Sequence, residues 1–229
     1  MDKNLDFELE TRKKIYNYIL KNPGVHLREL QRNLNIKIFN LKYHVQKLVK
    51  NGCIIQKKED GYLRFFVIHT VSNGDKKVLG ILRQKTARHI VLVALYEIAV
   101  SQKEICDFLQ KSPSTINFHI KNLLKNNIIE RISCENGIIK RVTEPKVLNK
   151  DLKGREVVFR LTDPHQIYTL LKRYKSTFQD EESKKIINLI NQFVNSGLGK
   201  KKTSGYFGMS NVDAYVEFMF EVFPHPYHV

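Results

Sequence analysis

Two segments of the chain carry amide, hydroxyl and ammonium groups at helical spacing, where they could act together on one ligand. The segment 37–50 holds Asn40 and Gln46 among lysines, and the segment 112–125 holds Asn117 among serine and threonine hydroxyls. An amide donates and accepts hydrogen bonds at once, while an ammonium group pairs with anionic oxygen. Such groups can recognise the edge of a heterocyclic base and a neighbouring phosphate.

The two segments belong to a repeat with an offset of 75 residues. The alignment needs no gap and matches identical residues: Glu29 with Glu104, Leu34 with Leu109, His44 with His119, Leu48 with Leu123, and Asn51 with Asn126. A repeat of this size is one supersecondary unit used twice. The histidines lie beside the predicted apolar stripes, so we expect them to pack or to contact phosphate rather than to bind a metal.

Each copy predicts three helices followed by a β-hairpin. In the first copy, the predicted helices are residues 7–21, 27–34 and 37–50, and the predicted strands are residues 53–58 and 63–69. In the second copy, a long apolar helix over Leu82–Ala99 precedes helices capped by Ser101 and Ser112, with strands over residues 128–133 and 156–161. Residues 72–79 between the copies predict a linker, and residues 134–155 predict a long loop between the strands of the second hairpin.

Three helices followed by a two-stranded hairpin make a winged helix. The stretches 40–48 and 112–123 resemble the recognition helix of ArsR- and MarR-type regulators, with a polar start, an aromatic-His pair and aliphatic residues at helical spacing. Over residues 8–70 and 80–162 the chain is similar to archaeal tandem winged helix-turn-helix transcription regulators. The resemblance implies a mainly α fold with small β-hairpin wings, in two tandem winged-helix domains over residues 1–72 and 78–162. A C-terminal helical segment, 163–229, with an aromatic tail follows them.

The same resemblance implies that double-stranded DNA is the partner, with one helix of each domain in a major groove about one helical turn (roughly 34 Å) from the other. The residues then expected to bind DNA are Lys37, Asn40, Lys42, Tyr43, Gln46 and Lys47 in the first helix, Lys57, Lys58 and Arg64 in the first wing, Ser112, Ser114, Thr115, Asn117, Phe118 and Lys121 in the second helix, and Lys140 and Arg141 in the second wing.

The charge distribution favours the same region. The chain has 39 Lys and Arg against 23 Asp and Glu, a net charge of +16, and residues 1–160 hold nearly all of the excess. A polyanion is therefore expected to bind there. The near-neutral remainder, residues 161–229, is expected to mediate a homodimer or to cover the apolar helix, and the Leu82–Ala99 helix is the other predicted route to a homodimer.

Other function classes have little support in the sequence. No phosphate-binding loop, GxGxxG, HExxH or GxSxG motif is present, so we expect neither an enzyme nor a cofactor. His225 and His228 are weak as a metal pair, and none of the three cysteines has CxxC spacing. No membrane span or signal peptide is expected, and we predict a cytoplasmic protein. The alternatives to sequence-specific DNA binding are a protein-interaction scaffold in a transcription or replication complex, and a sequence-neutral chromatin protein.

Overall fold

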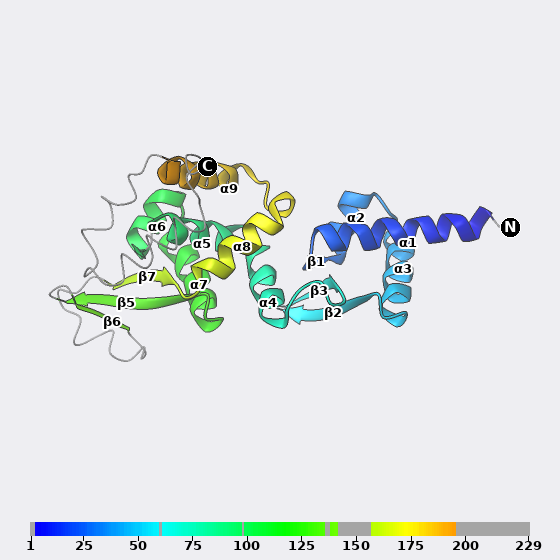
Figure 1. Cartoon of the computed structure of the whole chain (residues 1–229), viewed down its shortest axis with the longest axis horizontal. Helices are drawn as coiled ribbons and strands as arrows, with labels where there is room; N and C mark the ends of the chain where they lie inside the picture. The colour runs from blue at the N-terminus through cyan, green and yellow to red at the C-terminus, as the bar shows by residue number, and fades with distance from the viewer. Residues whose placement is uncertain (1–2, 60, 98, 136–137, 142–156, 196–229) are drawn as a thin grey trace, which may run out of the picture. The chain divides into compact units, whose positions relative to one another are not determined.

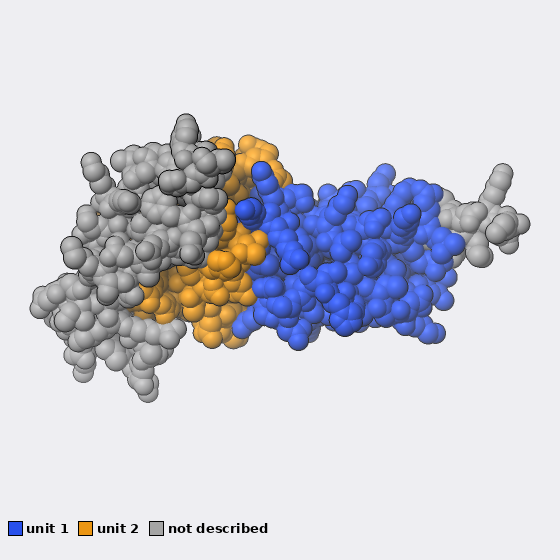
Figure 2. Space-filling model, in the orientation of Figure 1, with its two compact units in different colours: residues 1–84, 170–178 blue, residues 85–169, 179–229 orange. Residues whose placement is uncertain are grey.

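A computed structural model describes residues 3–59, 61–97, 99–135, 138–141 and 157–195 of the chain (Figure 1). The chain divides into two compact units, one formed by residues 1–84 with 170–178 and the other by residues 85–169 with 179–229 (Figure 2). The described part of the chain is mainly helical with small antiparallel sheets, which confirms the predicted fold class. No helix within it is long and apolar enough to cross a membrane.

The first unit contains a three-helix winged helix and one further helix. Its elements are α1 (Lys3–Lys21), β1 (Val25–His26), α2 (Leu27–Leu34), α3 (Ile38–Lys50), β2 (Ile54–Glu59), β3 (Tyr62–Val67) and α4 (Asn73–Leu82). The sheet has the order β1-β3-β2, with both pairs antiparallel. Its core is built from buried aliphatic and aromatic side chains of every helix and strand of the winged helix: Ile15, Ile19, Val25, Leu30, Leu41, Val45, Leu48, Ile54, Phe65 and Val67.

The prediction of a linker over residues 72–79 is wrong, because residues 73–82 form α4. Ser72 Oγ accepts a hydrogen bond from the Asp75 amide at 3.0 Å, which is an N-cap. Leu79 and its apolar neighbours on the helix are buried. The long helix predicted from Leu82 accordingly begins later, at Lys85. The polar residues and the glycine at the start of this segment are typical of a linker, but the apolar residues that follow form a buried face, which stabilises a helix.

Arg83, just after α4, fixes the end of this helix to the turn between α1 and β1. Its Nη1 donates to Glu29 Oε1 at 2.9 Å, its Nε to the Pro23 carbonyl at 3.1 Å, and its Nη2 to the Asn22 carbonyl at 3.2 Å. The Arg83 side chain is almost fully buried, so the guanidinium satisfies carbonyl groups that water does not reach. Glu29 belongs to α2, and this contact therefore also holds the first helix of the helix-turn-helix pair.

The second unit repeats the arrangement with additions. Its elements are α5 (Lys85–Glu97), β4 (Ala99–Ser101), α6 (Gln102–Leu109), α7 (Pro113–Lys125), β5 (Ile129–Glu135), β6 (Ile138–Arg141), β7 (Val157–Leu161), α8 (Pro164–Arg173), the 3₁₀ turn η2 (Lys175–Thr177) and α9 (Glu181–Asn195). Of these elements, the last turn of α8 and the whole of η2 belong to the first unit. The sheet order β4-β7-β5-β6 repeats that of the first unit and adds β6 at the edge. The expected loop after β5 therefore contains a strand.

The repeat offset holds for the helix-turn-helix itself, since α6 and α7 begin and end 75 residues after α2 and α3. The turn has the same backbone in both copies, with Asn35 at φ 52° and Gln110 at φ 51°. The predicted cap of α6 at Ser101 is present and forms a capping box, because Ser101 and Glu104 exchange hydrogen bonds with each other's backbone amides. In α2 the cap is His26, whose Nδ1 accepts from the Glu29 amide at 3.1 Å.

The chain after β7 contributes to both units. Thr177 Oγ1 donates to Asn22 Oδ1 at 3.1 Å and so joins η2 to the end of α1. The helix α9 packs instead on α5 within the second unit. The part of the predicted C-terminal segment from residue 196 onward, including the aromatic tail, lies outside the described residues, so the structure does not test it.

An ion-pair cluster holds the start of α9 on α5. The Asp180 carboxylate accepts from Arg88 Nη2 and from Ser183 Oγ, and it lies 2.7 Å from His89 Nε2. Burial alone would raise the pKa of Asp180, but hydrogen bonds from Ser183, His89 and Arg88 hold it well below its usual range.

The apolar residues of α5 are buried within the chain itself. Because Ile90–Leu95 are at most 1% exposed, a second subunit is not needed to bury them.

We predict that Asp180→Asn destabilises the second unit by about 2–4 kcal/mol, because the buried Arg88 loses its counter-charge. Urea unfolding followed by circular dichroism would measure this. The difference from wild type should shrink as the pH falls below about 4, because the contribution of a carboxylate with a depressed pKa is complete above its unfolded-state pKa and is lost as the pH falls toward the lower folded-state pKa.

The matched control is Glu182→Gln, because Glu182 pairs at 2.6 Å with Lys85 at a solvent-exposed position. We expect this variant to unfold at the same urea concentration as wild type, because ion pairs between exposed side chains are screened by water. Equal destabilisation by the two substitutions would contradict a special role for Asp180.

Candidate nucleic-acid interface

The helix α3 is anchored by one face and exposed by the other. Leu41, Val45 and Leu48 lie at i, i+4 and i+7 and are buried in the core of the first unit. The residues between them point to solvent, except for the buried His44. All six side chains predicted on this helix and its N-cap are exposed: Lys37, Asn40, Lys42, Tyr43, Gln46 and Lys47. The structure therefore brings this group together on one accessible face.

Every charged residue on the exposed face of α3 is basic. The helix sequence contains no Asp or Glu, and Lys47 Nζ lies 5.5 Å from the ring centroid of Tyr43. At its N-terminus the N-cap residue Lys37 makes no side-chain capping hydrogen bond. The positive end of the helix dipole and the lysines therefore both favour the binding of an anion at this face.

The helix α7 has the same anchoring but a different polar face. Ile116, Ile120 and Leu123 are buried at the positions equivalent to those in α3. The predicted residues Ser112, Ser114, Thr115, Phe118 and Lys121 are exposed, and Asn117 is half-buried. Like α3, the helix has no acidic residue.

The hydroxyls at the start of α7 form a small network. Ser112 Oγ accepts from the Thr115 amide at 3.4 Å and lies 2.9 Å from Thr115 Oγ1 and 3.1 Å from Ser114 Oγ. Ser112 is therefore occupied as the N-cap, as predicted, and Pro113 follows it at the first helical position. The other two hydroxyls remain accessible for contacts outside the protein.

The histidine that follows the exposed aromatic residue is packed in both helices. The Tyr43 and His44 ring centroids are 5.2 Å apart, and those of Phe118 and His119 are also 5.2 Å apart. Burial, reinforced by the charge of Lys111, lowers the pKa of His119 and favours its neutral form. These observations support packing over phosphate contact for the histidines.

The three basic residues predicted in the first wing differ in how far they are exposed to solvent. In the β2–β3 hairpin, Lys57 is half-buried and Lys58 is exposed. Arg64 is only 2% exposed, and its Nη1 donates to the Gly24 carbonyl at 3.0 Å. The prediction that Arg64 binds DNA is therefore wrong, because its guanidinium supports the turn between α1 and β1 instead.

In the second wing, Lys140 and Arg141 lie on β6, opposite Ser133 and Ile132 of β5. Their side chains are outside the described part of the structure, so their prediction stays a prediction. The strand position itself shows that this wing has one more strand than the first.

One exposed residue of α3 was missed. Phe39 is 82% exposed, which is the largest exposure among the large hydrophobic residues that the structure describes. Its position four residues before Tyr43 was readable from the sequence, because that spacing puts both rings on one helix face.

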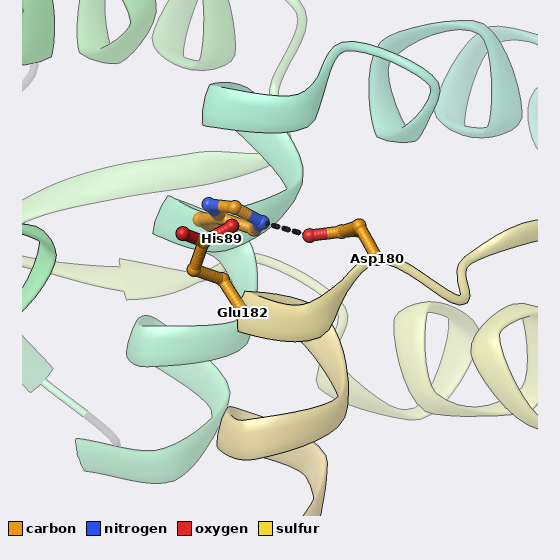
Figure 3. A group of neighbouring side chains, drawn as sticks. All are labelled: His89, Asp180 and Glu182. Atoms are coloured by element: carbon orange, nitrogen blue, oxygen red, sulfur yellow. Dashed lines mark hydrogen bonds and ion pairs between the residues drawn. The ribbon is translucent and has the colours of Figure 1, made fainter.

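A group of potential metal ligands also lies outside the two helices. Figure 3 shows His89, Asp180 and Glu182, whose ligand atoms all lie within 4.8 Å of one another. Arg88 and Lys85 already neutralise the two carboxylates, so a cation placed there would meet two positive charges. We therefore assign the group to the packing of α9. His225 and His228 lie outside the described residues.

Comparison with known proteins agrees with this geometry. Residues 9–79 match a family model described as an N-terminal HTH domain, and residues 99–130 match one described as winged helix-turn-helix DNA-binding. An uncharacterized HTH-type transcriptional regulator of Methanocaldococcus jannaschii is 30% identical over 154 residues, which are 67% of this chain. The chain matches only 34% of that relative's length. These findings confirm the predicted resemblance to winged helix-turn-helix regulators.

We predict that Arg64→Ala destabilises the first unit by about 1–3 kcal/mol, because the buried Gly24 carbonyl loses its donor. Lys58→Ala, on the same hairpin, should change the free energy of unfolding by less than about 0.5 kcal/mol. Urea unfolding of both variants would test this. If Arg64→Ala retained full stability and weakened DNA binding instead, the structural role of Arg64 would be refuted.

Proposed function

Because this chain carries two helix-turn-helix domains of DNA-binding type, we propose that it is a sequence-specific transcriptional regulator that binds double-stranded DNA. The observation that carries the proposal is the design shared by α3 and α7. Each helix is anchored by three buried aliphatic residues and exposes a face with lysine and without acid. A helix of this kind fits the major groove, where each base pair presents a distinct pattern of donors and acceptors.

The side chains divide into those that would position the protein and those that would read bases. Lysine ammonium groups pair with phosphate in any sequence, so Lys37, Lys42 and Lys58 would set affinity. Asn40 and Gln46 can form paired hydrogen bonds with adenine. In α7 the accessible hydroxyls of the first turn can bond to a base or a phosphate. The two helices therefore offer different chemistry to the bases.

The first test is selection of bound duplexes by the full chain from genomic fragments at moderate salt, followed by gel-shift assays. Recovery of a common motif supports the proposal. Equal affinity for the recovered fragments and for random duplexes would favour a sequence-neutral chromatin protein. Absence of a shift at low salt, with a stoichiometric protein partner in affinity purification, would favour an interaction scaffold.

We predict that Lys58→Ala weakens binding to all duplexes. It should also make the negative slope of log K against log salt concentration less steep by about 1, because one phosphate contact is lost. The control is Lys77→Ala, an exposed lysine of α4 with the same change in net charge. It should leave the slope unchanged, and an equal effect of the two substitutions would contradict a wing contact.

We also predict that Gln46→Ala lowers affinity for the selected motif by about 1–3 kcal/mol while leaving affinity for random DNA nearly unchanged. Fluorescence anisotropy with both duplexes would measure the two effects. A uniform loss on both duplexes would show that Gln46 does not read a base.

A further inference from the structure

The two most exposed large hydrophobic residues in the described part of the chain are on the two recognition helices. Phe39 of α3 is 82% exposed and Phe118 of α7 is 68% exposed, while Tyr43 of α3 is 44% exposed. A single exposed apolar residue is ordinary on a protein surface. Their concentration on the faces that also carry the lysines is not accounted for by packing within the chain.

Phe39 is the clearest case. It lies in the first turn of α3, four residues before Tyr43 and directly beside the exposed Asn40. Among the described residues, no ring contact involves Phe39, whereas the rings of Tyr43 and Phe118 each lie against the following histidine. The Phe39 ring therefore gives the fold almost nothing that a smaller side chain would not give.

The charge around Phe39 indicates what covers it. Lys37, Lys42 and Lys47 lie on the same exposed surface of α3, and the helix has no acidic residue. An apolar ring within a cationic surface fits a polyanion that itself presents an apolar group. In the major groove of DNA that group is the C5-methyl of thymine, which phenylalanine can contact.

We propose that Phe39 is a specificity-determining residue that packs on a thymine methyl in the major groove, next to an adenine bound by Asn40. This inference rests on the proposed DNA-binding function and names the base pairs that α3 reads, which are A·T pairs. The position equivalent to Phe39 in α7 is Ser114, an exposed hydroxyl. The two recognition helices consequently read different sequences, and the binding site is not a simple repeat of one half-site.

The test uses the full chain and the duplex recovered by selection. Each thymine is replaced singly by deoxyuracil, which removes only the C5-methyl and keeps the Watson–Crick pairing. For wild type we expect about fourfold weaker binding for each contacted methyl that is lost. In Phe39→Ala the penalty at one or two of these positions should disappear, and Phe39→Leu should restore part of it.

The control substitution is Leu9→Ala, which removes an exposed hydrophobic side chain of α1 in the same unit. It should leave every thymine-to-uracil ratio unchanged. Because Phe39 is almost fully exposed, its variants should unfold at the wild-type temperature, so a lost ratio would not come from misfolding.

The outcomes separate this inference from the proposed function. Failure to recover any duplex by selection would overturn both. Recovery of a duplex whose thymine-to-uracil ratios are the same in wild type and Phe39→Ala would overturn only the role of Phe39. A Phe39→Ala variant with normal DNA binding that loses a stoichiometric protein partner would assign the ring to a protein surface and also overturn the role.

Discussion

Burial of one aliphatic stripe on each recognition helix is the constraint on which the rest of the arrangement depends. Leu41, Val45 and Leu48 fix the rotation of α3 about its axis, because their spacing puts all three on one face of the helix and that face packs into the core. The other residues between them, apart from the buried His44, are then forced outward. The equivalent stripe in α7 has the same effect 75 residues later. The packing of the core therefore determines which residues of α3 and α7 are exposed.

The turn before each of α3 and α7, and the helix that precedes it, have the same backbone conformation and capping contact in both copies. Asn35 and Gln110 both adopt the left-handed region, which reverses the chain between the two helices of each pair. Glu29 and Glu104 stand at the third position of the preceding helix, where the amide of each is bonded to the cap residue. In the first unit, Arg83 also bonds to Glu29. Anchoring of both helices lets a rigid surface be presented, which lowers the entropy lost on binding.

The two copies have kept this framework and changed what surrounds it. The second sheet has the additional strand β6, and α7 begins with hydroxyls where α3 has lysine and phenylalanine. The second unit also carries α9, held on α5 through Asp180. Because none of these three differences replaces a residue of the buried stripe, the outer faces can differ in chemistry while the helix-turn-helix stays the same.

The sequence by itself determined the repeat, the helix-turn-helix segments, their buried stripes and the exposed faces, because these follow from local periodicity and capping within a few residues. Ser101, Ser112 and the aliphatic stripes all lie where the pattern put them. Only the tertiary structure decided that Arg64 is buried against the Gly24 carbonyl, since residues 64–67 are all buried and a strand covered on both faces has no alternating pattern that would reveal this. The same holds for Arg88 and Asp180, which are 92 residues apart in the chain and meet only through the packing of α9. Pairing over such distances leaves no periodic signal in the sequence, whereas a helix face does.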